Sequence, residues 1–467
     1  MINAIFSIPF MQRLQQQNYR PLVRVAVVLG VILLAVAAAL VDSHTVSLIL
    51  MGLPIGIGIV LIFMRHPGLG LVAMIPASFV IPFEIGVSSG SSLNPPMLII
   101  MLMTGLWVLD MVVIKRRIAF NSPQIMLPAV VLIVIVILAF INGQLPWFAF
   151  ANKAPITAQI GEVALFVLSV SIFLVAAHQI KSLVWLKAIT WVYLGIGLFF
   201  FIMETLPVIK AYSLRVYSYG ALTSLFWVWM VALSLGQALY NRHLLPWQRI
   251  GLILVTLITM FYGYTLIPGW KSGWVPALAA AAVLIALYSP KAAIAMVIGA
   301  VISSPIFLLS LISTDEYSYN TRVEAWLLIA QIVKASPILG VGPANYYWYT
   351  PLFPIRGYAV QFNSHNQFVD LIAQVGLLGM GTFMWLMLAI GNLGWKLRRF
   401  APEGFARGYV YSALAGLVGM LTAAMLGDWV IPFVYNVGFR GFRGSLFGWL
   451  FLGGLVALEK MIEKGEA

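Results

Sequence analysis

His365 is the residue of this sequence best placed for proton chemistry. It precedes an apolar run near 367–395 that is long enough to cross a bilayer as a helix. Such a helix would take Asn363 or Ser364 as its N-cap, and its N-terminus would disfavour protonation of a nearby imidazole. A neutral ring accepts a proton, so we expect His365 to orient or deprotonate a hydroxyl. The alternative is a histidine with a structural role only.

Arg322 is the second candidate, and its chemistry would be anion binding. Thr321 and Glu324 have capping-box spacing, which predicts a helix from Arg322 to just before Pro337. This helix is too short to span a bilayer, and we expect it to lie along the interface. Arg322 would then occupy its first turn, where a bound phosphate offsets the unfavourable helix dipole. Pairing with the acidic residues at 315–316 is the alternative.

Two further cations and a group of aromatic residues belong with these candidates. Arg215 and Lys271 lie among aromatic and glycine residues at the mouths of predicted helices, where they could contact the same anion as Arg322. Tyr347 and Trp348 belong to an aromatic cluster that fits either sugar stacking or anchoring at the membrane interface. Cysteine is absent and the acidic residues show no metal-ligand spacing, so the sequence proposes no metal site.

The elements that position these residues must be membrane helices. Of 467 residues, 62% are hydrophobic and only 9% are charged, whereas soluble domains carry about 25% charged residues. Fourteen apolar runs are candidate spans, and three short ones (162–177, 274–289 and 444–458) make twelve the lower count. Backbone groups in lipid must be satisfied internally, so the sequence predicts a single all-α polytopic domain over residues 1–467.

The other candidate spans lie near 25–41, 46–64, 69–86, 97–114, 125–141, 182–203, 220–240, 250–268, 292–312, 367–395 and 408–427.

The distribution of Lys and Arg predicts the orientation of this bundle. Eighteen of the 27 fall on one side, which the positive-inside rule places in the cytoplasm together with both termini. Two long segments, 313–366 and 428–443, then face outward, and the first is large enough for a small extracytoplasmic cap. Cations retained on this outer side suggest a phosphate-bearing ligand, although some would simply reach lipid headgroups. The nine outward cations are Lys153, Lys210, Arg215, Lys271, Arg322, Lys334, Arg356, Arg440 and Arg443.

About 60 residues resemble the signature region of the O-antigen ligase/polymerase family. They are Thr321-Arg322 and Trp326, then Ser336-Pro337-Ile338-Leu339-Gly340-Val341-Gly342, then Ser364-His365-Asn366-Gln367-Phe368 and Gln374-Val375-Gly376-Leu377-Leu378-Gly379. Upstream, Arg215 with Gly220 and the stretch Gly269-Trp270-Lys271-Ser272-Gly273-Trp274 are also similar to the family. Lys271 stands where the family has Arg, which keeps the charge but loses the bidentate fork.

The resemblance implies a GT-C-like bundle of 12–14 transmembrane helices with a helical extracytoplasmic cap. The implied activity is metal-independent, cofactor-free and inverting transfer of a glycan from undecaprenyl pyrophosphate at the outer face of the bacterial inner membrane. The acceptor would be lipid A–core in lipopolysaccharide biosynthesis, a growing polysaccharide, or protein.

In this reading Arg215, Lys271 and Arg322 hold the pyrophosphate, and His365 activates the acceptor. Tyr347, Trp348 and Asn366 are candidate glycan contacts. The competing class is a transporter or flippase of an anionic lipid-linked glycan, which would place ionisable residues near helix centres.

Overall fold

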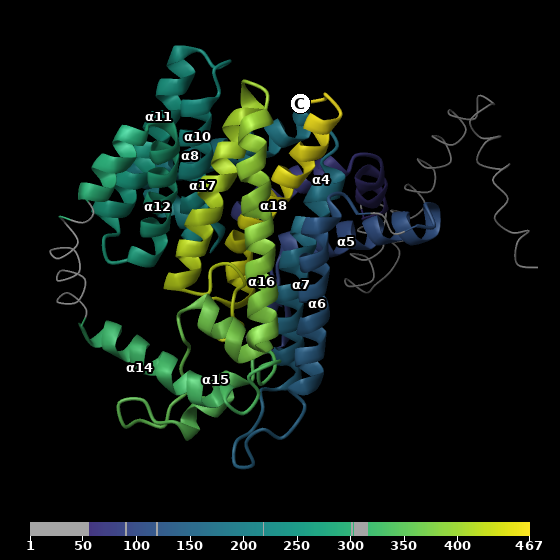
Figure 1. Ribbon diagram of the computed structural model, residues 1–467, viewed down its shortest axis with the longest axis vertical. Coiled ribbons are helices and arrows are strands. Elements are labelled where there is room, and N and C mark those ends of the chain that lie inside the picture. The colour runs from purple at the N-terminus through teal and green to yellow at the C-terminus, as the bar shows by residue number, and fades with distance from the viewer. Residues whose placement is uncertain (1–55, 89–90, 118–119, 218, 300–301, 303–315) are drawn as a thin grey trace, which may run out of the picture. The chain divides into compact units, whose positions relative to one another are not determined.

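The computed structural model describes residues 56–88, 91–117, 120–217, 219–299, 302 and 316–467 (Figure 1). The chain divides into two compact units, residues 1–66 and 67–467, and each is described by itself. Of the first unit, the described part is the apolar helix Gly56–Arg65. The second unit is an almost entirely helical bundle.

Nine helices in the described ranges are long and apolar enough to cross a membrane. The chain is therefore an all-α, multi-pass membrane protein, as its hydropathy predicts. These helices are α5 with its π-helical end η1 (Pro95–Ile114), α6 (Pro123–Asn142), α7 (Ile156–Gln179), α8 (Leu183–Thr205), α11 with η3 (Pro246–Leu266), α12 (Lys271–Tyr288), α16 (Gln367–Phe400), α17 (Phe405–Leu426) and α18 (Gly438–Glu463).

Shorter elements complete the unit. They are α4 (Pro67–Phe79), β1 (Ile85–Ser88), β2 (Ser91–Leu93), α9 (Pro207–Val216), η2 (Tyr219–Leu222), α10 (Ser224–Tyr240), the helix Pro290–Gly299, α14 (Glu316–Val333), α15 (Tyr346–Tyr349) and η4 (Thr350–Leu352). Strands β1 and β2 pair antiparallel, with Ile85 opposite Leu93.

Eleven of the fourteen predicted runs overlap helices in the described ranges, and nine of these helices are long and apolar enough to cross a membrane. The run 220–240 corresponds to η2 and the 17-residue α10, and the run 69–86 is longer than its helix, because the 13-residue α4 ends at Phe79 before β1. The three short runs belong to α7, α12 and α18, each of which is long and apolar enough to cross a membrane. The run 25–41 lies outside the described residues, and the runs 46–64 and 292–312 lie partly outside them.

The centre of the bundle is formed by α7, α10, α17 and α18 (Figure 1). Helices α10, α17 and α18 pack against one another, and α7 packs against α18. Glycines allow this close packing. A side chain at Gly453 of α18 would meet the backbone of Phe173 on α7, and one at Gly236 of α10 would meet Ser412 on α17. Small residues at such contacts are the usual means by which membrane helices approach one another.

The bundle has two chemically different ends. Helices α7 and α18 begin near α14 and α15, which we call the cap end, and finish near the C-terminus, which we call the basic end (Figure 1). The 24 residues of α7 separate these ends by about 36 Å. Lys181 and Lys464, predicted to be cytoplasmic, lie at the basic end, whereas Arg322 and His365 lie at the cap end. The structure thus places these residues at opposite ends of the bundle, as predicted, while the side facing the cytoplasm stays a prediction.

The glycine motif after Pro337 joins the cap to a membrane helix through main-chain atoms. Gly340 and Gly342 have φ angles of +69° and +95°, and Gly376 breaks α16 with a φ of +68°. A side chain at Gly376 would collide with the backbone at Ile338. The motif is therefore the close-approach turn that its glycines predict. Four hydrogen bonds connect the segments, from the amides of Val341, Gly342, Leu377 and Leu378 to the carbonyls of Ala373, Gln374, Pro337 and Ile338, respectively.

Arg443 shows that a cation on the predicted outer side can be purely structural. Its side chain is buried, and its guanidinium donates to the carbonyls of Ala77, Ser78, Ile81 and Phe83 at 2.7–3.3 Å. These carbonyls lie at the C-terminal end of α4 and just beyond it, where helix carbonyls have no intrahelical donors. Arg443 thus fixes the start of α18 against the end of α4.

Candidate active site

A cavity of about 330 Å³ at the cap end brings Arg322 and His365 together. Three parts of the chain form it: α14, the stretch from Tyr347 to His365, and the 428–437 segment that connects α17 to α18. Among the described residues, its lining contains no carboxylate. The lining residues are Thr321, Arg322, Ala325, Tyr347, Ile355, Gln361, Phe362, Asn363, His365, Tyr435 and Asn436.

Arg322 lies in the second turn of its helix, which corrects the prediction from the capping box. Helix α14 begins at Glu316, so the dipole argument for a bound anion does not apply. Glu324 instead binds Arg356, with 3.2 Å between Oε2 and the guanidinium Nε and 3.0 Å from the Arg356 amide to Oε1. The alternative partners at 315–316 have side chains outside the described residues. Within the described part of the chain, the Arg322 guanidinium makes no hydrogen bond or ion pair.

His365 has a constrained backbone and an unengaged ring. Its φ angle is +49°, which is uncommon for a residue with a side chain, and its amide donates to Asn363 Oδ1 at 2.6 Å. Burial lowers the pKa of His365, and the nearby Arg322 charge lowers it further. The ring is therefore neutral at pH 7, and it makes no hydrogen bond to any described residue. A neutral imidazole facing a cavity can accept a proton from a substrate.

The N-cap of α16 is Asn366, so the prediction of Asn363 or Ser364 is wrong. Its Oδ1 accepts hydrogen bonds from the amides of Phe368 at 3.0 Å and Val369 at 3.4 Å. The side chain of Asn366 is engaged by this cap and does not line the cavity, which leaves it away from any glycan there. Because Asn366 caps the helix, Asn363 does not. Asn363 lines the cavity instead, and its buried Nδ2 group has no partner in the described ranges.

Stacked tyrosines form the aromatic side of the cavity. The rings of Tyr347 and Tyr435 lie 4.6 Å apart and are inclined by only 15°. Trp348 does not line the cavity, but its indole N–H donates to the Tyr435 hydroxyl at 2.7 Å. Flat aromatic faces beside amide donors are typical of ligand sites that combine apolar surface with a few placed polar groups. Of the predicted aromatic contacts, Tyr347 is therefore placed to touch a ligand and Trp348 supports its neighbour.

Three buried carboxyl groups hold the walls of this cavity from behind. Asp370 Oδ1 accepts from the hydroxyls of Tyr346 at 2.5 Å and Ser364 at 2.7 Å. Each of these residues precedes a residue of the cavity lining, Tyr347 and His365, respectively. Asp370 thus connects the aromatic wall to the histidine wall.

Asp428 and Glu162 hold the third wall of the cavity, the 428–437 segment, by hydrogen bonds of the same kind. Asp428 accepts from the Asn436 side chain at 2.5 Å and the Phe433 amide at 2.8 Å, and Glu162 accepts from the Val434 amide at 2.8 Å. Burial raises the pKa of Asp428. Glu162 is a site residue without a motif in the sequence; its one signal is that it is an ionisable residue within a membrane helix, which marks a functional site by default.

Lys271 lies at the same end of the bundle but not in this cavity. It begins α12, where the preceding Trp270 contacts Trp429 with ring centroids 5.8 Å apart. Arg215 belongs to α9, and its side chain lies outside the described residues. Of the three predicted cation and histidine side chains that the structure describes, Arg322 and His365 line one cavity and Lys271 does not, while the prediction for Arg215 stays untested.

Comparison of the chain with models of known protein families and with curated proteins gives no match.

Proposed function

We propose that this protein is a membrane glycosyltransferase that takes a glycan from an undecaprenyl-pyrophosphate donor. The observation that carries the proposal is the shared cavity of Arg322 and His365. Arg322 is a cation with no partner among the described residues, and His365 is a neutral base. The Tyr347–Tyr435 pair and the Asn363 amide, which has no partner in the described part of the chain, line the same cavity, and both groups suit a sugar. The resemblance to O-antigen ligases and polymerases supports the same assignment.

The proposed reaction is a single displacement at the anomeric carbon. His365 accepts the proton of an acceptor hydroxyl, whose oxygen then forms a bond to that carbon. The bond from the carbon to the donor phosphate breaks, and its electron pair leaves on the pyrophosphate. Arg322 stabilises the negative charge that grows there, and the anomeric configuration inverts. Arg215 and Lys271, at the same end of the bundle, would contact the remainder of the lipid-linked donor.

Transport of a lipid-linked glycan is the competing function, and the positions of the buried acids disfavour it. A transport path would place ionisable groups near helix centres. Asp370 instead lies in the first turn of α16, and Glu162 lies in the second turn of α7. Both hydrogen-bond to groups at the cap end, which fits acids that organise one site.

A transfer assay with purified protein and lipid-linked donor tests the proposal. His365→Ala should lower turnover by roughly 10²–10⁴-fold, the range for loss of a general base. Arg322→Ala should lower it by roughly 10²–10³-fold, the range for loss of a charge-stabilising donor. Lys334→Ala is the matched control, because Lys334 is an exposed cation just past α14 that binds only Gln331 in the described structure. Near-normal turnover in both site variants would refute the proposal.

The acceptor is identified by mass spectrometry of glycoconjugates from a deletion strain. Long unligated chains on the lipid carrier would assign the protein as a ligase. Single capped repeat units would assign it as a polymerase.

A further inference from the structure

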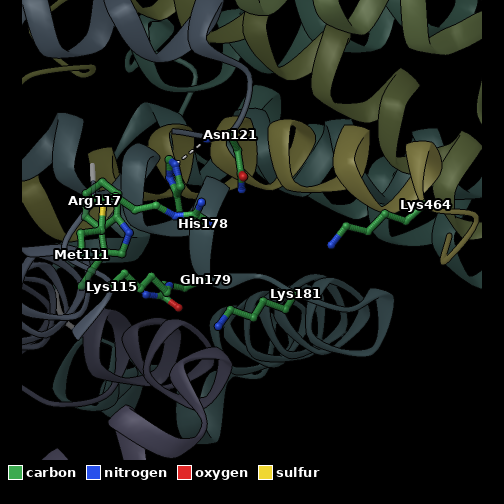
Figure 2. Close-up of a pocket in the computed structure, with 9 residues that line it drawn as sticks. Met111, Lys115, Arg117, Asn121, His178, Gln179, Lys181 and Lys464 are labelled. Atoms are coloured by element: carbon green, nitrogen blue, oxygen red, sulfur yellow. Dashed lines mark hydrogen bonds between the residues drawn. The ribbon is translucent and has the colours of Figure 1, made fainter. Parts of the chain in front are cut away.

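A second cavity, of about 280 Å³, lies at the basic end of the bundle and collects cations from separate elements (Figure 2). Lys115 directly follows η1, and Arg117 lies two residues further along the chain. Lys181 lies between α7 and α8, and Lys464 lies at the end of α18. Figure 2 shows Lys115 and Arg117 on one side of the hollow, with Lys181 and Lys464 extending toward it from the other side.

The charges of this cavity are not balanced by its own lining. Among the described residues, no Asp or Glu lines it. Lys115 is paired with Asp110 at 2.5 Å, but the charged side-chain groups of Arg117, Lys181 and Lys464 make no hydrogen bond or ion pair within the described structure. Bringing several like charges around one hollow costs electrostatic energy, and a bound anion removes that cost. An adjoining cavity of about 230 Å³ shares Lys181 and Lys464, and there Glu466 is the acidic lining residue.

Two neutral polar residues of the cavity lining, Asn121 and His178, are held in place by hydrogen bonds. The Asn121 amide donates to His178 Nε2 at 2.9 Å, and His178 Nδ1 lies 2.7 Å from the Leu174 carbonyl (Figure 2). With Nε2 accepting, the ring proton is on Nδ1, which donates to that carbonyl. His178 therefore carries no charge in this arrangement and positions the 120–123 segment against α7.

An apolar wall continues from the cavity onto the outside of the bundle. Trp107 and Met111 line the cavity. The next residues, Val112, Val113 and Ile114, are 54%, 60% and 66% exposed. A ligand that contacts the cations could therefore extend apolar chains along η1, as an anionic phospholipid does and a soluble anion does not. Basic pockets between helices on the cytoplasmic side are suited to such headgroups.

We propose that this cavity binds the phosphate headgroup of an anionic phospholipid from the leaflet at the basic end, with Lys181 and Lys464 as its principal contacts. The proposal is independent of the transfer reaction at the cap end. Its readout is lipid binding alone.

Titration of the detergent-purified protein with phosphatidylglycerol, followed by native mass spectrometry, tests this site. Replacing two lysines, Lys181→Gln with Lys464→Gln, should weaken binding roughly 20-fold, since each cation near a headgroup contributes substantially to affinity. The matched control is Lys291→Gln with Lys396→Gln, which removes two exposed lysines outside the cavity and leaves the same net charge. It should bind within about twofold of the parent protein. The pair Lys181→Arg and Lys464→Arg preserves the charge and should keep most of the affinity.

Three outcomes would overturn the proposal. Equal loss in the two glutamine pairs would show diffuse attraction without a site. Equal affinity for phosphatidylglycerol and phosphatidylcholine would show that the phosphate headgroup's net charge is not recognised. Displacement of phosphatidylglycerol by millimolar inorganic phosphate would assign the cavity to a soluble anion.

Discussion

Arg322 and His365 line one cavity although they belong to different elements, and the guanidinium lowers the pKa of an imidazole that burial has already lowered. Each residue thereby supports the role proposed for the other. The cation is available to a departing pyrophosphate, and its charge keeps the histidine in the proton-accepting form. A neutral residue in place of Arg322 would affect both functions.

The first prediction concerns the pH dependence of transfer. His365 has a pKa below 6.5, so the base form should persist at neutral pH, and kcat/KM should fall as the pH drops through that pKa. Burial and the Arg322 charge both lower the pKa of His365, and burial is the larger cause. Arg322→Gln removes the charge, so the pKa of His365 should rise part of the way towards 6.5. The acidic limb of the residual activity should then move to higher pH, whereas Lys334→Gln should leave it in place. A limb that stays fixed or moves to lower pH in Arg322→Gln would contradict the coupling.

The second prediction concerns Asp370 as a positioning residue. Asp370→Ala leaves the buried hydroxyl of Tyr346 without its carboxylate acceptor, which costs roughly 1–3 kcal/mol for an unpaired group. It also removes one of the two acceptors of the Ser364 hydroxyl, which keeps the Asn366 carbonyl. Because Ser364 adjoins His365, kcat should fall more than KM rises. Asp370→Asn retains one acceptor oxygen and should recover part of both stability and kcat. Thermal unfolding and steady-state kinetics measure these effects, and unchanged values in Asp370→Ala would exclude the role.

The third prediction tests the junction between the cap and α16. Gly376→Ala requires a side chain at a φ of +68° in contact with the backbone at Ile338, so it should lower the melting temperature markedly. Gly381→Ala is the matched control on the same helix, because a side chain there meets nothing within 4 Å. It should be neutral or slightly stabilising. Equal melting temperatures for the two variants would show that the junction contributes little.

The fourth prediction separates a structural cation from the proposed site. Arg443→Met leaves several carbonyls near the end of α4 without donors, at roughly 1–3 kcal/mol for each buried group left unpaired. Arg440→Met removes a largely exposed cation that approaches Glu84 at 3.5 Å, and surface pairs of this kind contribute about 0–1 kcal/mol. Thermal unfolding in detergent should show a large loss only for Arg443→Met. Comparable losses would mean that the carbonyl cluster is not what Arg443 stabilises.

The sequence predicts the helical bundle well because long apolar runs leave few structural alternatives in a bilayer. It also predicts that Arg322 and His365 belong to one site. It fails at the start of α14, where the local capping signal of Thr321 and Glu324 is overridden by a longer helix and by the pairing of Glu324 with Arg356.

The supporting shell of the site was not predicted, for a physical reason. Asp428 holds the 428–437 segment from within, whereas Glu162 hydrogen-bonds Val434, which lies 272 residues further along the chain, and neither spacing nor periodicity reveals a contact between such distant residues. Lys271 shows the converse case. It lies at the cap end of the bundle, as Arg322 does, but this end is wide enough that two residues can both lie there without lining the same cavity.

The main-chain junction at Gly376 has a consequence for how such proteins diverge. Its hydrogen bonds use only backbone amides and carbonyls, which every residue except proline carries, so selection acts there on the absence of a Cβ atom rather than on side-chain identity. Two proteins could differ at nearly every neighbouring side chain and still form the same main-chain junction. We therefore expect distant members of this architecture to share a spacing of glycines long after their overall sequence similarity has disappeared.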